Sequence, residues 1–123
     1  MQFLTLSGKK ILITGASSGI GQDTAIMLSK LGGQLLIHGR NEERLSKTLS
    51  MLEGEGHSMV LGDLTVDEDV ERLVKAAPAL DGLVHCAGII YPHPIKFITR
   101  KNIEEAMNAN FVSAALLTSM AAR

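Results

Sequence analysis

Four short apolar runs alternate along the chain with longer amphipathic segments, and this alternation limits the possible folds more than any other feature. The apolar runs predict β-strands at residues 10–14, 35–38, 59–61 and 83–87. The amphipathic segments predict helices at residues 19–31, 42–53, 67–77 and about 101–122. A loop is expected at 89–98, where Pro92 and Pro94 prevent a regular strand. Because the runs are apolar at consecutive positions, the strands should be covered on both faces, as in a parallel sheet between two layers of helices.

The helical segments also carry cues about their ends and faces. Asn41 is expected to cap the second helix. The apolar spacing in the first helix is carried by Ile20, Thr24, Ile26–Met27 and Leu31. One side of the last helix carries Ile103, Met107, Asn110–Phe111 and Leu117.

The connections between the strands restrict the topology. Right-handed crossovers predict the strand order 3-2-1-4, a Rossmann-type, doubly wound α/β fold of three layers, α/β/α. With 123 residues, the whole chain (1–123) is expected to form a single domain. In this order the winding reverses between the first and fourth strands and opens a crevice beyond their carboxyl ends, where a ligand is expected to bind.

Composition and charge exclude several classes of function. The formal net charge is −1, so neither nucleic acid nor a membrane is an expected partner. The single cysteine excludes an internal disulfide, and the four histidines show no metal-ligand spacing, so no metal is expected. No run approaches the ~18 apolar residues of a membrane span, and the first residues lack the basic flank of a signal peptide. A cytoplasmic protein is therefore expected.

A glycine-rich turn follows the first strand and carries the strongest functional motif, Thr14-Gly15-Ala16-Ser17-Ser18-Gly19-Ile20-Gly21. Gly15 permits a sharp turn, Gly19 lets backbone approach a ligand, and Gly21 lets the helix lie close to the sheet. The free N–H groups of the helix then suit a pyrophosphate. The motif predicts cofactor-binding roles for Gly15, Ser17, Ser18, Gly19, Ile20 and Gly21. The alternative is a glycine-rich turn without a ligand, and a P-loop is excluded because no Gly-Lys-Ser/Thr follows.

The end of the second strand indicates which dinucleotide would bind. An acidic residue there would hydrogen-bond the adenosine ribose and repel a 2′-phosphate. This chain has Gly39 and Arg40 instead, and no carboxylate before Glu42, so NADP(H) is favoured over NAD(H). An ordinary surface arginine is the alternative.

Two further segments are expected at the same edge of the sheet. Asp63-Leu64 follows the third strand, where the carboxylate could accept a hydrogen bond from the adenine amino group or simply form an Asx turn. Small residues at Cys86, Ala87 and Gly88 would leave room for a ribose after the fourth strand. The Cys86 thiol itself is interpreted as a small buried hydrophobe without thiol chemistry.

Together these residues resemble the short-chain dehydrogenase/reductase family. Thr14, Gly15, Gly19 and Gly21 meet the family's Thr-Gly-x3-Gly-x-Gly pattern in full, and Asp63 matches its acidic residue after the third strand. The run 85–88, His-Cys-Ala-Gly, corresponds to the family's Asn-Asn-Ala-Gly with both asparagines replaced. The resemblance assigns a catalytic role to Asn110, as the asparagine that supports a water-linked proton relay. Without the resemblance, a solvated residue would be expected there.

The resemblance implies hydride transfer between a nicotinamide and a carbonyl or alcohol substrate. In the family a Tyr transfers the hydroxyl proton, a Lys four residues later lowers its pKa, and a Ser orients the substrate. Tyr91 cannot fill this role, because Lys96 lies five residues on and two prolines intervene. The chain therefore resembles the amino-terminal portion of the enzyme, incomplete before strand 5, and on its own it is expected to be inactive. The resemblance also implies a homo-oligomer formed through the last helix, and the isolated chain is expected to be marginally stable.

Two alternative functions remain at this point. A non-catalytic NADP(H)-binding or partner-binding module would need no catalytic residues. A Rossmann-type methyltransferase is disfavoured, because it normally has an acidic residue where Gly39 and Arg40 stand.

Overall fold

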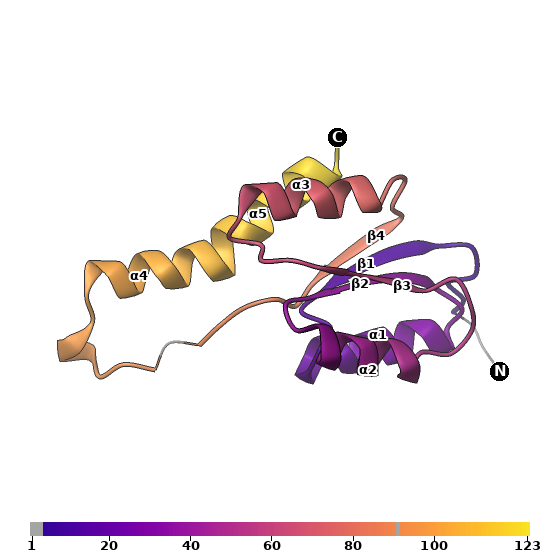
Figure 1. Ribbon diagram of the computed structural model, residues 1–123, viewed down its shortest axis with the longest axis horizontal. Helices are drawn as coiled ribbons and strands as arrows, with labels where there is room; N and C mark the ends of the chain where they lie inside the picture. Colours follow the sequence, from indigo (N-terminus) through magenta and orange to yellow (C-terminus); the bar gives the residue numbers. More distant parts are fainter. Residues whose placement is uncertain (1–3, 91) are drawn as a thin grey trace.

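The computed structural model describes residues 4–90 and 92–123, which form a parallel sheet with helices on both faces (Figure 1). All three strand pairings are parallel, and the strand order is β3-β2-β1-β4, so the predicted topology is confirmed. The strands are β1 (Lys10–Thr14), β2 (Gln34–Gly39), β3 (Ser58–Leu61) and β4 (Gly82–His85). β4 ends two residues earlier than expected, and beyond it the amides of Cys86 and Ala87 donate to Oγ1 of Thr14.

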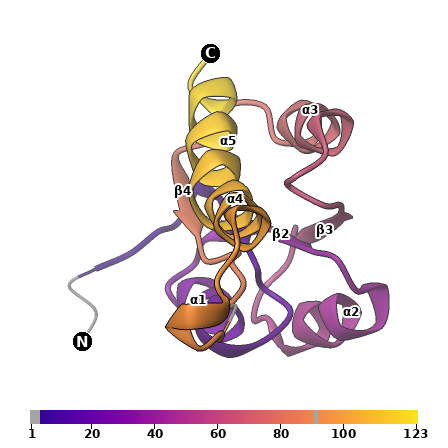
Figure 2. The same cartoon turned by 90° about the vertical axis from the view of Figure 1, so that its left-hand side faces the viewer.

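The helices α1 and α2 pack on one face of the sheet, and α3 and α5 pack on the other (Figure 2). The chain contains α1 (Gly19–Lys30), α2 (Glu42–Met51), α3 (Asp67–Ala76), α4 (Arg100–Met107) and α5 (Ser113–Ala121). Short turns of 3₁₀ helix (η1, Ile95–Phe97) and π helix (η2, Asn108–Val112) complete the elements. The predicted cap of α2 is present, because Oδ1 of Asn41 accepts a hydrogen bond from the backbone N–H of Arg44 at 2.9 Å.

The core consists of two apolar layers separated by the sheet. Successive strand residues point to opposite faces, so Ile11 and Ile13 pack on the α1–α2 side while Leu12 packs on the α3–α5 side. The first layer contains Ile11, Ile13, Ala16, Ala25, Leu35, Ile37 and Leu45. The second contains Leu12, Leu36, Leu64, Val70, Leu73 and Leu117. Burial on both faces explains why the strands are apolar at consecutive positions.

The inward face of α1 differs from the one that the apolar spacing indicates. Ile20 and Met27 are 79% and 57% exposed, whereas Gly21, Ala25 and Ser29 are buried. The fully buried positions of α1 thus carry small residues, and the larger Leu28 packs against this layer only partly buried.

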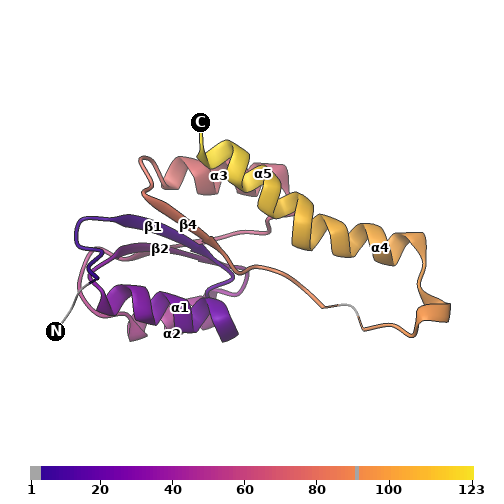
Figure 3. The ribbon, with the colours of Figure 1, turned by 180° about the vertical axis from the view of Figure 1, so that it is seen from behind.

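The last helical segment has the expected extent but not the expected packing. It runs continuously from α4 through the π turn η2 into α5. Only α5 lies over the sheet, whereas α4 extends beyond it (Figure 3). Leu117 is therefore fully buried, while Ile103, Met107 and Phe111 are more than half exposed. None of the helices among the described residues is long and apolar enough to cross a membrane.

Candidate functional site

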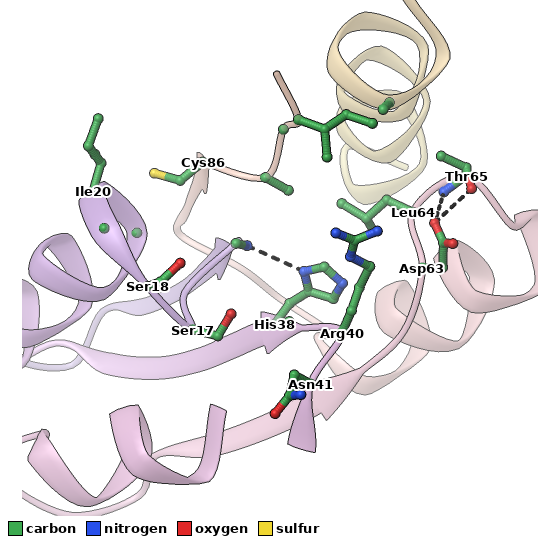
Figure 4. A pocket seen from close by; sticks show the side chains of 18 of the residues that line it. Ser17, Ser18, Ile20, His38, Arg40, Asn41, Asp63, Leu64, Thr65 and Cys86 are labelled. Carbon is green, nitrogen blue, oxygen red and sulfur yellow. Dashed lines mark hydrogen bonds between the residues drawn. The ribbon is translucent and has the colours of Figure 1, made fainter. Parts of the chain in front are cut away.

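A cleft of about 750 Å³ opens at the carboxyl ends of the strands, where the sequence predicts a ligand site. The loops after all four strands contribute to its wall (Figure 4). The predicted cofactor-binding residues all line it: Gly15, Ser17, Ser18, Gly19, Ile20, Gly21, Arg40, Asp63, Leu64, Cys86, Ala87 and Gly88. Segments separated by more than 70 positions in the sequence thus meet in one cavity.

The three glycines of the turn after β1 meet three different steric demands. Gly15 has φ +63°, and a Cβ there would lie 2.6 Å from the amide nitrogen of Ala87. A Cβ on Gly21 would lie 2.0 Å from the carbonyl oxygen of Gly15. Gly19 has φ +55°, and a Cβ there would meet no atom within 4 Å among the described residues. Gly15 and Gly21 therefore permit close packing within the fold, whereas Gly19 borders the open space of the cleft.

The amino-terminal end of α1 faces the cleft without a side-chain cap. Ser18 is the N-cap residue, and its side chain accepts no capping hydrogen bond from the part of the chain that the structure describes. The first N–H groups of a helix have no partners within the helix and carry partial positive charge. This end of α1 therefore suits an anionic group such as a phosphate.

The hydroxyl group of Thr14 connects the ends of β1 and β4. Its Oγ1 accepts hydrogen bonds from the amides of Cys86 and Ala87 at 3.1 and 3.2 Å. The same oxygen lies 3.0 Å from Nδ1 of His85. Since two N–H groups already donate to Oγ1, the hydroxyl proton is donated to Nδ1, and the remaining proton of this neutral ring is on Nε2. The Nε2 atom is buried and has no hydrogen-bond partner among the described residues.

His38 lies at the carboxyl end of β2 and lines the cleft, a role that the sequence reasoning missed. Its side chain is only 2% exposed. The Gly15 amide donates to Nδ1 at 3.4 Å, and Nε2 lies 2.8 Å from the carbonyl oxygen of Gly62. Burial lowers the pKa of this imidazole below its ordinary value of 6.5. The sequence signal that could have pointed to His38 is its position as a polar residue at the end of an otherwise apolar strand.

Arg40 extends into the cleft from the loop after β2 (Figure 4). Its side chain forms no ion pair with any described carboxylate. Asn41 and Arg44 also line this part of the cleft, although sequence reasoning gave Asn41 only a capping role and did not consider Arg44. The adenosine end of the predicted site thus contains two guanidinium groups.

Asp63 forms the Asx turn that was one of its two predicted roles. Its Oδ1 accepts hydrogen bonds from the backbone N–H and the hydroxyl group of Thr65, at 2.9 and 2.7 Å. These bonds are the main reason that the pKa of the Asp63 carboxyl group is lowered. Its neighbour Leu64 is only 7% exposed and packs in the α3–α5 layer.

Asn110 fastens the loop after β4 to the π turn of the last helix. Its Oδ1 accepts from the amide of Ile89 at 2.7 Å, and its Nδ2 donates to the carbonyl oxygen of Ile89 at 2.8 Å. A Cβ on Gly88 would lie 2.9 Å from Oδ1 of Asn110, so the loop passes close to the helix. π turns often occur at functional sites. Asn110 itself does not line the cleft, although Asn108 and Ala109 do.

Cys86 and Tyr91 follow β4 at this end of the site. Cys86 is half-buried and lines the cleft beyond the end of β4, so it is less buried than expected, and its lack of thiol chemistry stays a prediction. Tyr91 lies outside the described residues, and its exclusion from catalysis stays a prediction.

Within residues 4–90 and 92–123, no cluster of three His, Cys, Asp or Glu side chains could hold a metal ion.

Comparison with known proteins decides the family. The family model for short chain dehydrogenases matches residues 9–123. The chain belongs to the short-chain dehydrogenase/reductase family. The prediction made from the motifs at 14–21, 63 and 85–88 is therefore confirmed.

Curated relatives of this short-chain dehydrogenase/reductase chain are oxidoreductases. It is 38% identical to glucose 1-dehydrogenase from Gluconobacter oxydans, over 89% of this chain and 44% of the relative. It is 32% identical to L-xylulose reductase from Caenorhabditis elegans, over 94% of this chain and 47% of the relative. The chain thus spans about half the length of the curated relatives it matches.

Solved structures of the family share the fold. A dehydrogenase/reductase from Sinorhizobium meliloti 1021 matches with a TM-score of 0.89 and 29% identity, over 97% of this chain and 50% of that one. A variant actinorhodin polyketide ketoreductase, solved with NADPH, matches with a TM-score of 0.89 and 26% identity, over 98% of this chain and 49% of that one.

Proposed function

We propose that the chain forms the NADP(H)-binding part of a short-chain oxidoreductase that acts on a carbonyl or alcohol substrate. The observation that carries the choice of NADP(H) is the guanidinium group of Arg40 in the cleft, which forms no ion pair within the described part of the chain and lies at a strand end without a carboxylate. Guanidinium groups bind phosphate through paired hydrogen bonds, whereas a carboxylate would repel the 2′-phosphate that distinguishes NADP(H) from NAD(H).

The residues around the cleft fit the parts of such a dinucleotide. The turn from Gly15 to Gly21, with the uncapped end of α1, would hold the pyrophosphate, and Gly19 leaves the open space that this needs. Arg40 would bind the 2′-phosphate, while Asp63 and Leu64 would border the adenine. When bound, the nicotinamide supplies or accepts the hydride.

The loop after β4 would flank the nicotinamide ribose. Cys86, Ala87 and Gly88 bring little side-chain bulk to this wall, and the backbone amides of Cys86 and Ala87 are already held by Thr14. Asn110 holds the next residue through two hydrogen bonds, so it would keep the loop in place and support the proton relay.

Fluorescence titration of the purified protein with NADPH and NADH tests the cofactor proposal. The wild type should bind NADPH more tightly, and Arg40→Asp should weaken NADPH binding by roughly tenfold to a hundredfold while leaving NADH binding unchanged or stronger. Arg100→Asp is the matched control, because it makes the same charge change at an exposed residue outside the cleft. Equal binding of both dinucleotides by the wild type, or an equal effect of both substitutions, contradicts the proposal.

Three further properties belong to the same proposal. The 123-residue chain contains no Tyr-x-x-x-Lys sequence, so it should reduce no ketone at a measurable rate when purified by itself. The exposed side chains of Ile103, Met107 and Phe111 would support self-association through the last helix, which sedimentation can test. The site of action is proposed to be the cytoplasm, which microscopy of a tagged protein can test.

A further inference from the structure

His38 is a buried histidine that joins two loops of the cleft. The imidazole sits at the end of β2, between the turn after β1 and the loop after β3. The Gly15 amide donates to Nδ1 at 3.4 Å, and the Gly62 carbonyl oxygen lies 2.8 Å from Nε2. Both partners are backbone groups, so the imidazole holds the backbone of both loops.

These two contacts specify the protonation state of the ring. The Gly15 amide can only donate, so Nδ1 carries no proton, and the Gly62 carbonyl can only accept, so Nε2 carries one. A neutral imidazole in this tautomer satisfies both groups. A doubly protonated ring would point an N–H group at the N–H of Gly15 and break that contact.

Charged and titratable groups approach His38 from three directions. Arg40 approaches from the loop after β2, Asp63 from the loop after β3, and His85 from β4. Arg40 and His85 oppose a positive charge on His38, whereas Asp63 favours one. Burial has the largest influence and also opposes the charge, so the pKa of His38 is lowered and the ring is neutral near pH 7.

We infer that His38 is a positioning residue for the dinucleotide, because its neutral imidazole holds the Gly15 amide and thereby sets the phosphate-binding turn against the loop that begins at Gly62. This inference rests on the proposed function. Gly15 leads directly into the turn, and its carbonyl oxygen is the atom against which Gly21 packs. Displacement of Gly15 would therefore shift the start of α1, which faces the cleft.

Two substitutions separate the two contacts of the imidazole. The side-chain amide of His38→Asn can place an acceptor near the position of Nδ1, which keeps the bond from Gly15 and loses the one to Gly62. The longer side chain of His38→Gln can place a donor near the position of Nε2, which keeps the bond to Gly62 and loses the acceptor for Gly15. Neither variant titrates at this position, and both replace the ring by an amide.

NADPH affinity and the urea unfolding midpoint are then measured for the three proteins between pH 5 and pH 8. At pH 7.5, His38→Gln should raise the Kd for NADPH roughly fivefold to tenfold, the effect of one neutral hydrogen bond, and His38→Asn should stay within about twofold of the wild type. Below pH 6 the wild type should lose more affinity than His38→Asn. The titration of the ligand's own 2′-phosphate is common to both proteins, so their difference reports on His38.

A merely structural role makes a different prediction. In that case the Kd values follow the unfolding midpoints whichever contact is kept, and the wild type and His38→Asn share one pH profile; either result overturns the inference. If His38→Gln does not fold, the comparison of the wild type with His38→Asn across the pH range still decides. A wild type that binds neither NADPH nor NADH refutes the proposed function itself, whereas NADPH binding that is equal in all three proteins removes only the role of His38.

Discussion

Replacement of Gly21 by alanine is expected to destabilise the protein, although the same change usually stabilises a helix. Alanine is favoured over glycine in a helix interior by about 1 kcal/mol. At position 21, however, a Cβ atom would lie 2.0 Å from the carbonyl oxygen of Gly15 and 2.7 Å from the carbonyl carbon. Both atoms belong to the backbone, so α1 has to withdraw from the turn by about 1 Å, and overpacking of this kind costs about 3 kcal/mol. The net loss in the free energy of unfolding is therefore about 2 kcal/mol.

Chemical and thermal unfolding measure this loss directly. For a domain of this size, about 2 kcal/mol corresponds to a decrease in Tm of roughly 8 °C. The urea midpoint should fall while the m-value stays the same, because the surface exposed on unfolding hardly changes. A Gly21→Ala variant as stable as the wild type, or more stable, would refute the close-packing argument for this glycine.

Gly19→Ala should show the opposite combination, a small loss of stability and a large loss of binding. Gly19 and Gly8 have φ values of +55° and +79°, and a Cβ on either would meet no described atom within 4 Å. Alanine in this conformation costs about 1 kcal/mol at both positions. Only Gly19 lines the cleft, so Gly19→Ala should weaken NADPH binding and the matched control Gly8→Ala should not. Equal affinities of the two variants would show that Gly19 does not border the phosphates.

Three further perturbations test the contacts around the cleft. Asn110→Ala removes two hydrogen bonds to Ile89 and should cost about 1–2 kcal/mol, with faster hydrogen exchange at the Ile89 amide; unchanged exchange there would contradict the role of Asn110. Thr14→Val keeps the shape but leaves the Ala87 amide without its acceptor, while the Cys86 amide keeps only its 3.3 Å bond to the Thr14 carbonyl oxygen. Urea unfolding should therefore show a loss of about 1–3 kcal/mol, and a neutral effect would be evidence against this contact. Burial lowers the pKa of His38 and of His85 below 6.5, so the unfolded chain binds protons that the folded chain does not. Stability should be complete above pH 6.5 and fall as the pH decreases from there, and urea midpoints that stay constant down to pH 5 would contradict this assignment.

The strands and their order could be predicted because each strand is apolar on both faces and ends at a turn residue. The first strand was expected at 10–14, where β1 lies, and the strand order was expected as 3-2-1-4. The inward face of α1 could not be predicted in the same way. Periodicity ranks residues by hydrophobicity, whereas the close contact of α1 with the turn after β1 depends on the absence of a side chain at Gly21. Ile20 was consequently placed on the wrong face.

The residues that line the site could be predicted better than the bonds that support them. The glycine turn, Arg40 and Asp63 follow successive strands, and the carboxyl ends of parallel strands meet at one edge of the sheet. The contact of His38 with Gly15 and Gly62 depends instead on the register of three strands. A short-range sequence pattern does not contain that register.

Three polar residues nevertheless share one recognisable position, the carboxyl end of an apolar strand, where their side chains can bond to the loops that follow. Thr14, His38 and His85 stand at or next to the last residue of strands whose middle residues are apolar. The parallel ladder ends there: the Cys86 amide still donates to the Thr14 carbonyl oxygen, while the amides of Gly15 and Ala87 donate to the side chains of His38 and Thr14. These bonds form when the chain folds. The turn and the loop after β4 are therefore held in place before a dinucleotide arrives, and binding does not have to supply the free energy that orders them.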